Sequence, residues 1–364
     1  MDTTALDIVF DSQGVCNYCA DFVARLGHIL HEDEERKRVR MAQLVARCKH
    51  RGRNLDYDCV IGVSGGVDSS WVLVQAIELG LRPLAVHMDN GWNSELAQNN
   101  IANLVRGLGV DLYTHVIEWT EYRSLMQAFF DADVIDVELL YDNAMLAVNF
   151  QQAAKFGVNY IMAGSNSSSE GMTMPRKWHA FKFDKCNIRA IARRAGIRAL
   201  RTFPSVGTIE RAYFELVKRV GWVSFLDYIP YNKFDAMTQL AARFQYKPYP
   251  YKHYESIFTR FYQGHILPTK FNVDKRRLHF STLIMSGQLD RESSLHDLRS
   301  PPYPDENSRR SDEEYFLKKM QWSSAQLREY LNRPRVEHET YGSEERFYTR
   351  LRRIYGALAG GARG

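Results

Sequence analysis

A strand in this sequence ends in two glycines followed by hydroxyl and carboxylate side chains, in the stretch "VIGVSGGVDSS" from Val60 to Ser70. A strand that passes through glycines into a helix gathers backbone N–H groups at the helix N-terminus, where the helix dipole also favours an anion. Gly65 and Gly66 leave no Cβ in the way of a ligand. The stretch therefore predicts a phosphate site at the end of a buried strand.

Strand and helix patterns alternate around this stretch. Apolar runs predict strands, and longer amphipathic runs predict helices that end at glycines. The predicted strands cover 57–63, 82–89, 111–118 and 158–164, and the predicted helices cover 69–80, 94–109 and 143–157. This alternation predicts an α/β fold with a doubly wound parallel sheet, whose ligand lies at the carboxyl ends of the strands.

The composition limits the class of protein. Of 364 residues, 45 % are hydrophobic and 25 % charged, as in ordinary soluble globular proteins. No run of about 18 apolar residues predicts a membrane span, and the N-terminus lacks the pattern of a secretion signal. Five cysteines do not form a disulfide framework, so we expect a cytoplasmic protein. The net charge of +5 suits an enzyme that handles nucleotides as well as a protein with a polyanionic partner.

The chain divides into four predicted parts. Residues 1–56 are a segment with a CxxC pair, a short strand at 8–11 and a charged helix, and 57–200 form the sheet domain. Residues 201–355 are an added, mainly helical region for substrate or partner. The glycine-rich end, 356–364, is predicted to be a flexible tail.

Asp68 is unusual in a phosphate loop. A carboxylate beside phosphates is repulsive unless a cation lies between them, so Mg²⁺ is implied. The loop also carries hydroxyl donors on Ser64, Ser69 and Ser70. No lysine follows the glycines, so this is not a GxxxxGK[ST] loop.

With Ser64 to Ser69 reading SGGVDS, the chain resembles the PP-loop ATP pyrophosphatases, of adenine nucleotide alpha hydrolase-like (HUP-type) fold. Members of that family transfer AMP from ATP to a carbonyl oxygen and then displace it with a nitrogen or sulfur nucleophile. Two further stretches, "AVHMDNGWNS" and "IMAGSNSSSEG", are similar to the family's adenosine and nucleotide-closing loops. The resemblance implies Asp68 and Ser69 as catalytic residues and an ATP site made of Ser64, Gly65, Gly66, Val67, Ser70, His87, Met88, Asp89, Asn90, Gly164, Ser165 and Asn166.

A basic stretch, "RKWHAFKFDK", follows these loops. Its lysines Lys177, Lys182 and Lys185 are candidates to neutralise pyrophosphate, and we assign Lys182 to the catalytic set. A solvated basic loop is the alternative.

The stretches before and after the sheet domain narrow the resemblance to one group of PP-loop enzymes. "IVFDSQGVCNYC" and the long stretch from Lys252 to Arg291 are similar to the N-acetyl sugar amidotransferases, so that the match spans most of 7–295. This implies an ATP-dependent ligase that turns an acetamido group of a nucleotide-activated sugar, such as a UDP-diacetamido uronic acid, into an acetamidino group, in O-antigen lipopolysaccharide or other surface-polysaccharide biosynthesis. It also implies ammonia from a separate glutaminase subunit, passed through a cyclase-like partner.

The second half holds candidate substrate residues. Lys275, Arg276 and Arg277 stand in series, with Lys270 nearby, and suit a diphosphate or a uronate. The surrounding aromatic residues are predicted to pack in a core or a subunit interface, which leaves a homo-oligomer open; they are Tyr249, Tyr251, Tyr254, Phe258, Phe261 and Tyr262.

Cys16 and Cys19 have the spacing of one half of a zinc knuckle. Relatives commonly carry a second CxxC shortly upstream, which this sequence lacks. Two interpretations stay open: a Zn²⁺ site completed by Cys48 or a histidine, or two buried thiols.

Two other functions remain as alternatives. A tRNA-thiolating enzyme would share the ATP loops, but we find no added RNA-binding module, and Cys186 is the one cysteine suitably placed to carry sulfur. A non-catalytic nucleotide-binding subunit would have no need of Asp68 and Ser69. Nucleic acid is therefore not the expected partner.

Overall fold

The computed structural model describes residues 1–249 and 255–361. Its sheet is parallel throughout, with the strand order β3-β2-β1-β4-β5. The chain runs outward from β1 to one edge and then returns to β4 on the other side of β1, so the order reverses between these two strands. The bounds are β1 Cys59–Gly62, β2 Pro83–Asp89, β3 Leu112–Val116, β4 Tyr160–Ala163 and β5 Gly221–Ser224.

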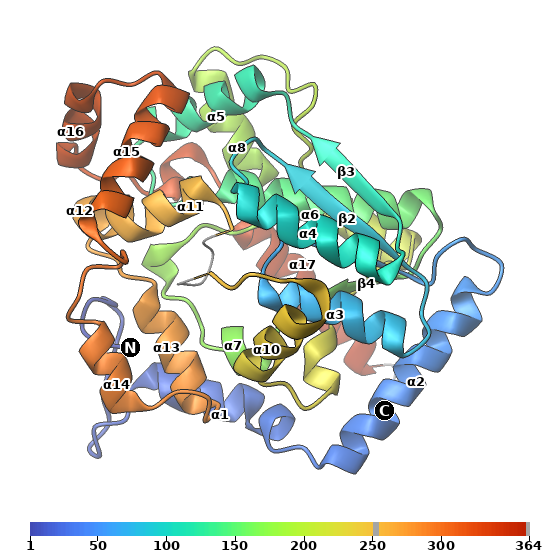
Figure 1. Ribbon diagram of the computed structural model, residues 1–364. Coiled ribbons are helices and arrows are strands. Elements are labelled where there is room, and N and C mark those ends of the chain that lie inside the picture. The colour runs from blue at the N-terminus through green and yellow to red at the C-terminus, as the bar shows by residue number, and fades with distance from the viewer. Residues whose placement is uncertain (250–254, 362–364) are drawn as a thin grey trace.

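Helices cover both faces of the sheet (Figure 1). Alternate side chains of β1 enter two separate cores, Val60 on one face and Cys59 and Ile61 on the other. The predicted α/β, doubly wound fold is therefore confirmed. The core that holds Ile61 is closed by α2 (Glu34–Gly52), α3 (Val67–Glu78), α4 (Glu95–Leu108) and α10 (Lys233–Phe244), and the core that holds Val60 by α5 (Trp119–Asp131), α6 (Leu139–Lys155) and α8 (Lys185–Arg194).

Two strand predictions differ from the structure. The sheet continues past residue 200, because β5 pairs with β4 inside the region predicted to be mainly helical. Strand β5 has four half-buried residues and no alternation, so nothing marks it in the sequence. The predicted strand at 8–11 was wrong: only Phe10 makes a bridge, to Cys16, and Val9 is 66 % exposed, so no sheet covers this segment.

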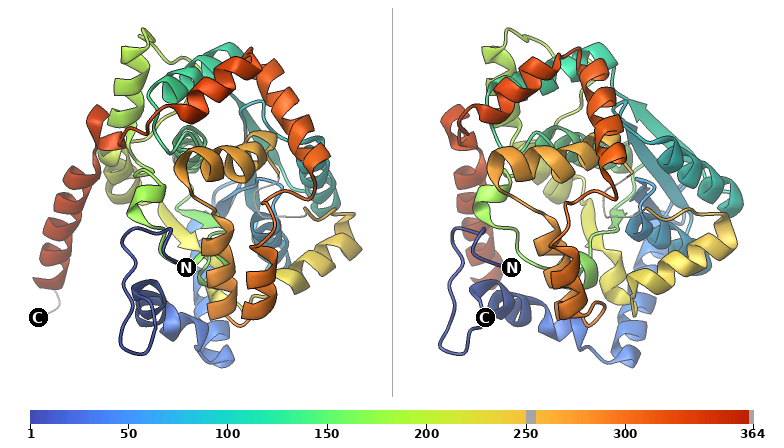
Figure 2. Two further views of the ribbon diagram at one scale, coloured as in Figure 1. Left: turned by 90° about the vertical axis from the view of Figure 1, so that its left-hand side faces the viewer. Right: turned by 60° about the vertical axis from the view of Figure 1, so that its left-hand side comes forward.

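The C-terminal helices pack on the sheet domain (Figure 2), and aromatic rings meet at this contact. Trp92, in the loop after β2, contacts the rings of Phe258 and Phe316. Phe258, Phe261 and Tyr262 are buried, as the packing prediction required, whereas Tyr251 and Tyr254 lie outside the described residues. The helices are α11 (Ile257–Phe261), η4 (Tyr262–Ile266), α12 (Leu267–Phe271), α13 (Arg276–Met285), α14 (Arg291–Asp297), α15 (Glu306–Met320) and α16 (Ser324–Asn332).

Shorter elements and the chain ends complete the fold. The described helices include none both long and apolar enough to cross a bilayer. The tail predicted over 356–364 begins inside the last helix, and residues 362–364 lie outside the described part. The remaining elements are α1 (Asn17–Leu30), α7 (Ser167–Glu170), η1 (Arg176–Trp178), α9 (Thr208–Ala212), η2 (Tyr213–Val217), η3 (Phe225–Tyr228), η5 (His338–Tyr341) and α17 (Glu345–Gly361).

Candidate active site

The SGGVDS loop leads from β1 into α3, and its conformation depends on its glycines. Gly65 has φ +85°, and a Cβ there would lie 3.0 Å from the carbonyl oxygen of Ala97. The loop is held internally, because Gly66 N donates to Ser64 Oγ at 3.2 Å and Ser64 N donates to Ser69 Oγ at 3.3 Å. No side chain caps the N-terminus of α3, so this end of the helix suits an anion.

A cavity of 660 Å³ opens beside this loop, at the carboxyl ends of β1 and β4 where the strand order reverses. This is the place where open parallel sheets bind ligands, and the volume is that of a small-molecule site. The loop after β4 closely approaches α3: a Cβ on Gly164 would lie 2.8 Å from Ser69 N. The SGGVDS loop and the loop after β4, both predicted to bind the nucleotide, therefore meet at the cavity. Predicted site residues that line it are Ser64, Gly66, Val67, Asp68, Ser69, Met88, Asn90, Gly164, Ser165, Lys182 and Lys275.

Other residues that were predicted to bind the nucleotide lie behind the surface that lines the cavity. His87 is buried, and its Nδ1–H donates to the carbonyl of Val63 at 2.8 Å while its Nε2 accepts from Asn93. Burial lowers the pKa of His87 and favours this neutral ring. Asp89 accepts from Gly91 N in its turn. These side chains shape the loops and do not line the cavity, and the same holds for Gly65, Ser70 and Asn166.

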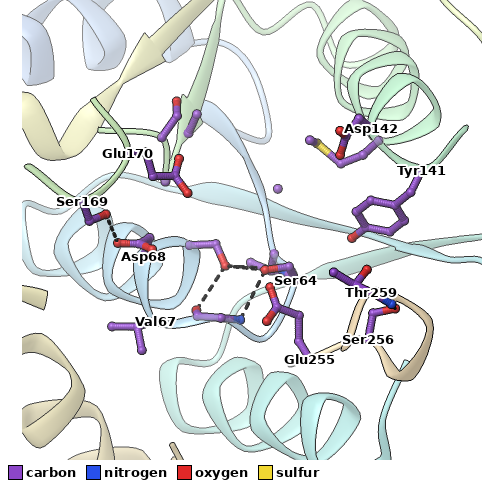
Figure 3. A pocket seen from close by; sticks show the side chains of 18 of the residues that line it. Ser64, Val67, Asp68, Tyr141, Asp142, Ser169, Glu170, Glu255, Ser256 and Thr259 are labelled. Carbon is purple, nitrogen blue, oxygen red and sulfur yellow. Dashed lines mark hydrogen bonds between the residues drawn. The ribbon is translucent and has the colours of Figure 1, made fainter. Parts of the chain in front are cut away.

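Asp68 is bound by side chains from outside the loop, and Figure 3 draws its hydrogen bond with Ser169. Its Oδ1 accepts hydrogen bonds from Tyr231 OH at 2.5 Å and from Ser169 Oγ at 3.1 Å. Asn166 Nδ2 lies 3.4 Å from the same oxygen. Burial and the charge of Asp68 raise the pKa of Tyr231, so its hydroxyl stays a donor. The sequence analysis missed Tyr231, which follows a half-buried strand far along the chain, and Ser169, which the serine run "SNSSSEG" signals.

A second carboxylate, Glu170, lines the cavity beside Asp68 (Figure 3). Among the described residues no group of three potential ligands could hold a metal ion. Mg²⁺, however, usually binds through one or two carboxylates together with phosphate oxygens and water. Asp68 and Glu170 therefore fit a Mg²⁺ ion that arrives with a nucleotide, and Glu170 is a candidate that the sequence analysis missed.

The three lysines that were predicted to neutralise pyrophosphate all form ion pairs with carboxylates of the protein. Lys182 lines the cavity, but its Nζ lies 2.6 Å from Asp136 Oδ2 and 2.8 Å from Asp142 Oδ2. Burial alone would lower the pKa of Lys182, yet the two carboxylates outweigh it and raise the pKa. Lys177 pairs with Glu337 and Lys185 with Glu210, both outside the cavity lining. The catalytic role of Lys182 stays a prediction, and in the structure two carboxylates hold its ammonium at the cavity.

Of the predicted substrate residues, Lys275 alone reaches the cavity. Its Nζ pairs with Glu138, which Gln263 also contacts, and all three residues line the cavity. The other three stay predictions: they do not line the cavity, and their charges are paired within the fold. The Lys270 side chain is 1 % exposed and pairs with Asp133, Arg276 pairs with Asp274, and Arg277 pairs with Asp2.

The CxxC pair lies at the start of α1, outside the cavity lining. Cys16 Sγ accepts from Cys19 N as the helix cap, and the two sulfur atoms are 3.5 Å apart. Burial and the hydrogen bond to Cys16 raise the pKa of Cys19 to about 11, which favours thiols. Cys48 lies near Cys59 instead. In the part of the chain that the structure describes, no third ligand completes a zinc site.

The SGGVDS loop after β1, the reversal of strand order and the cavity beside them agree with the resemblance of the sequence to the PP-loop ATP pyrophosphatases and their adenine nucleotide alpha hydrolase-like fold. Residues 255–355 match the family model described as LPS biosynthesis protein WbpG-like, C-terminal domain. Residues 255–355 thus form a WbpG-like C-terminal domain, in agreement with the resemblance seen in this part of the sequence.

The comparisons with curated proteins and with solved structures add little to the assignment of the family. A search of curated proteins found no match. Among solved structures, the chain is similar to NH3-dependent NAD synthetase from Campylobacter jejuni, with TM-score 0.29, 16 % identity, and coverage of 57 % of this chain and 93 % of that one. It is also similar to NMN synthetase from Francisella tularensis, with TM-score 0.30, 11 % identity, and coverage of 60 % and 99 %. At these TM-scores the fold assignment rests on the strand order and the SGGVDS loop.

Proposed function

We propose that this protein is an ATP-dependent amidotransferase that converts an acetamido group of a nucleotide-activated sugar into an acetamidino group. One observation carries the proposal: a single cavity is lined both by the SGGVDS loop and by residues of the WbpG-like domain. ATP at the loop would meet an acceptor held by the cavity residues of the WbpG-like domain. The WbpG-like match favours a sugar of lipopolysaccharide biosynthesis, and the ATP requirement favours reaction in the cytoplasm.

The reaction has two steps. The amide oxygen attacks the α-phosphorus, the bond to the β-phosphate breaks, and pyrophosphate leaves with the electron pair. Ammonia then adds to the amide carbon, AMP leaves with the former amide oxygen, and loss of a proton gives the amidine. An amide oxygen is a poor leaving group and AMP is a good one, which is why the first step is needed.

The residues of the cavity divide between these tasks. The N-terminus of α3 would bind phosphate, and Asp68 and Glu170 would hold Mg²⁺, which supplies charge neutralisation when bound. From the WbpG-like domain, Gln263 and Lys275 offer polar contacts to the sugar, while Ser256 and Thr259 offer hydroxyls. The chain's own contribution is to orient the amide oxygen and exclude water.

Ammonia is proposed to come from separate glutaminase and cyclase-like subunits. Of the five cysteines, none lines the cavity, so the site itself offers no nucleophile for glutamine hydrolysis. The same fact disfavours tRNA thiolation. Cys186, the predicted sulfur carrier, is outside the cavity lining, and burial and Asp184 raise its pKa.

The test is to incubate the protein with Mg²⁺, ATP, ammonium and a panel of nucleotide diacetamido sugars. We expect AMP and pyrophosphate in equal amounts, and a product whose mass shows one oxygen replaced by NH. Glutamine should not replace ammonium, and Asp68→Ala should abolish turnover with an unchanged circular dichroism spectrum. Formation of ADP in place of AMP would disprove the proposal.

A further inference from the structure

Tyr141 presents a hydroxyl to the cavity that the fold itself does not use. The residue lies in the first turn of α6 and lines the cavity, and Figure 3 shows its ring pointing into that space. Within the described residues, no group forms a hydrogen bond with this hydroxyl. Burial raises the pKa of Tyr141, so the hydroxyl keeps its proton and remains a donor. A ligand in the cavity can therefore supply the acceptor that the protein does not.

Helix α6 connects two parts of the cavity lining. At its N-terminal end Glu138 pairs with Lys275 of the WbpG-like domain. About three turns further on, Asn149 approaches β1, because a Cβ on Gly62 would lie 3.0 Å from Asn149 Nδ2. At 1.5 Å per residue, Tyr141 is about 4.5 Å along the helix axis from Glu138 and about 12 Å from Asn149. Tyr141 therefore lies toward the residues of the WbpG-like domain.

The charges that act on the Tyr141 hydroxyl disfavour an anionic ligand group there. Glu255, Asp142 and Asp89 all add to the increase in its pKa, which means that each of them opposes a second negative charge at this position. The lysine beside Asp142 is Lys182, whose ammonium Asp142 shares with Asp136. A phosphate or carboxylate oxygen would be repelled here, whereas a neutral carbonyl oxygen would not. The acetamido group of the acceptor carries such an oxygen.

We propose that the Tyr141 hydroxyl donates a hydrogen bond to the carbonyl oxygen of the acetamido group that reacts. This role rests on the proposed function. An amide oxygen has two lone pairs, so one can accept from Tyr141 while the other attacks the α-phosphorus. When AMP leaves, the electron pair of the broken C–O bond moves to this same oxygen, and the hydrogen bond stabilises the charge that develops there. Tyr141 is then a catalytic residue that touches the acceptor.

The test compares the wild type with Tyr141→Phe, which keeps the ring and removes only the hydroxyl. Calorimetric titrations would use Mg²⁺-ATP, a UDP-diacetamido uronic acid, and the deacetylated form of that sugar nucleotide, which lacks the carbonyl oxygens. A hydrogen bond between neutral groups corresponds to about threefold to tenfold in Kd. We expect that increase in Kd for the acetylated sugar alone. The free energy of unfolding should stay unchanged, because the variant loses no hydrogen bond within the fold.

Tyr213→Phe is the matched control, because Tyr213 is exposed and lies outside the cavity lining. It loses the same hydroxyl and should bind all three ligands as the wild type does. The inference is overturned if Tyr141→Phe binds the acetylated sugar as the wild type does, binds Mg²⁺-ATP more weakly, or is less stable. Equal losses for the two sugars, or no binding of the acetylated sugar by the wild type, would also overturn it.

The inference and the proposed function can fail separately. If the selective loss is found but the wild type releases ADP in place of AMP, the proposed function fails and the acceptor site stands. If the wild type forms the amidine and AMP while Tyr141→Phe binds the acetylated sugar normally, the proposed function stands and the role of Tyr141 is wrong.

Discussion

The hydroxyl of Tyr231 donates a 2.5 Å hydrogen bond to the carboxylate of Asp68. This contact joins the segment after β5 to the first helix of the sheet domain. It fixes the one carboxylate that we assign to Mg²⁺ within the SGGVDS loop. The orientation of Asp68 therefore depends on a residue outside every nucleotide motif.

Tyr231→Phe tests this dependence. Removing a hydrogen bond to a charged group should lower kcat about tenfold and raise the Mg²⁺ concentration needed for half-maximal rate, because Asp68 loses its closest donor. The measurement is AMP release as a function of Mg²⁺ concentration. Tyr228→Phe is the control, since Tyr228 packs against Arg40 and lies outside the cavity lining. An unchanged Mg²⁺ dependence in Tyr231→Phe would contradict the assignment.

Gly164→Ala tests the close approach of the two nucleotide loops. The added methyl would lie 2.8 Å from Ser69 N, so β4 and α3 must separate. We expect a loss of about 1–3 kcal/mol in the free energy of unfolding, measured with urea, together with weaker ATP binding. Gly221→Ala should keep ATP affinity, because the nearest atom to its Cβ is 3.8 Å away. Wild-type stability and affinity in Gly164→Ala would show that the loops are not in contact.

Because His338 is buried, we expect the stability of the protein to depend on pH. Its Nε2 accepts from Asp136 N at 3.1 Å, and its Nδ1–H donates to Asn187 Oδ1 at 2.9 Å. Burial lowers its pKa from 6.5 to about 4. Between these values the unfolded chain binds a proton that the folded chain does not, so stability falls as the pH falls from 6.5 to 4. The contribution is about 3 kcal/mol.

The comparison is with His338→Gln, whose amide can replace both hydrogen bonds but does not titrate. Urea unfolding at several pH values should give a shallower acid loss for the variant than for the wild type. Parallel curves for the two proteins would mean that His338 has an ordinary pKa in the folded state.

Lys270→Met separates stability from substrate binding. The Lys270 ammonium donates to Asp133 and to the carbonyls of Tyr330 and Arg333, all within the fold. Its removal should cost about 3 kcal/mol of stability and leave KM for the sugar nucleotide unchanged. Lys318→Met, at an exposed position of α15, should change neither quantity. If Lys270→Met has a raised KM for the sugar nucleotide at a temperature where the variant is folded, Lys270 binds substrate, as the sequence suggested.

The local signals of the sequence determined much of the fold. Buried apolar runs, glycine helix ends and the SGGVDS turn are set by neighbouring residues, so the first four strands and the phosphate loop could be predicted. The edge strand β5 could not, because a half-buried strand of four residues has no pattern of its own and forms only by pairing with β4. The WbpG-like resemblance was equally readable, since it rests on contiguous stretches.

Only the tertiary structure decided which charged side chains serve the cavity. Lysines and arginines in one basic run look alike in sequence, yet Lys275 faces the cavity while Arg276 is bound by Asp274. Long side chains bind to groups that folding brings near them. Lys182 pairs with Asp136, and the hydroxyl of Tyr231 donates to Asp68. Because these partners are far apart along the chain, their pairing follows from packing, and no local pattern encodes it.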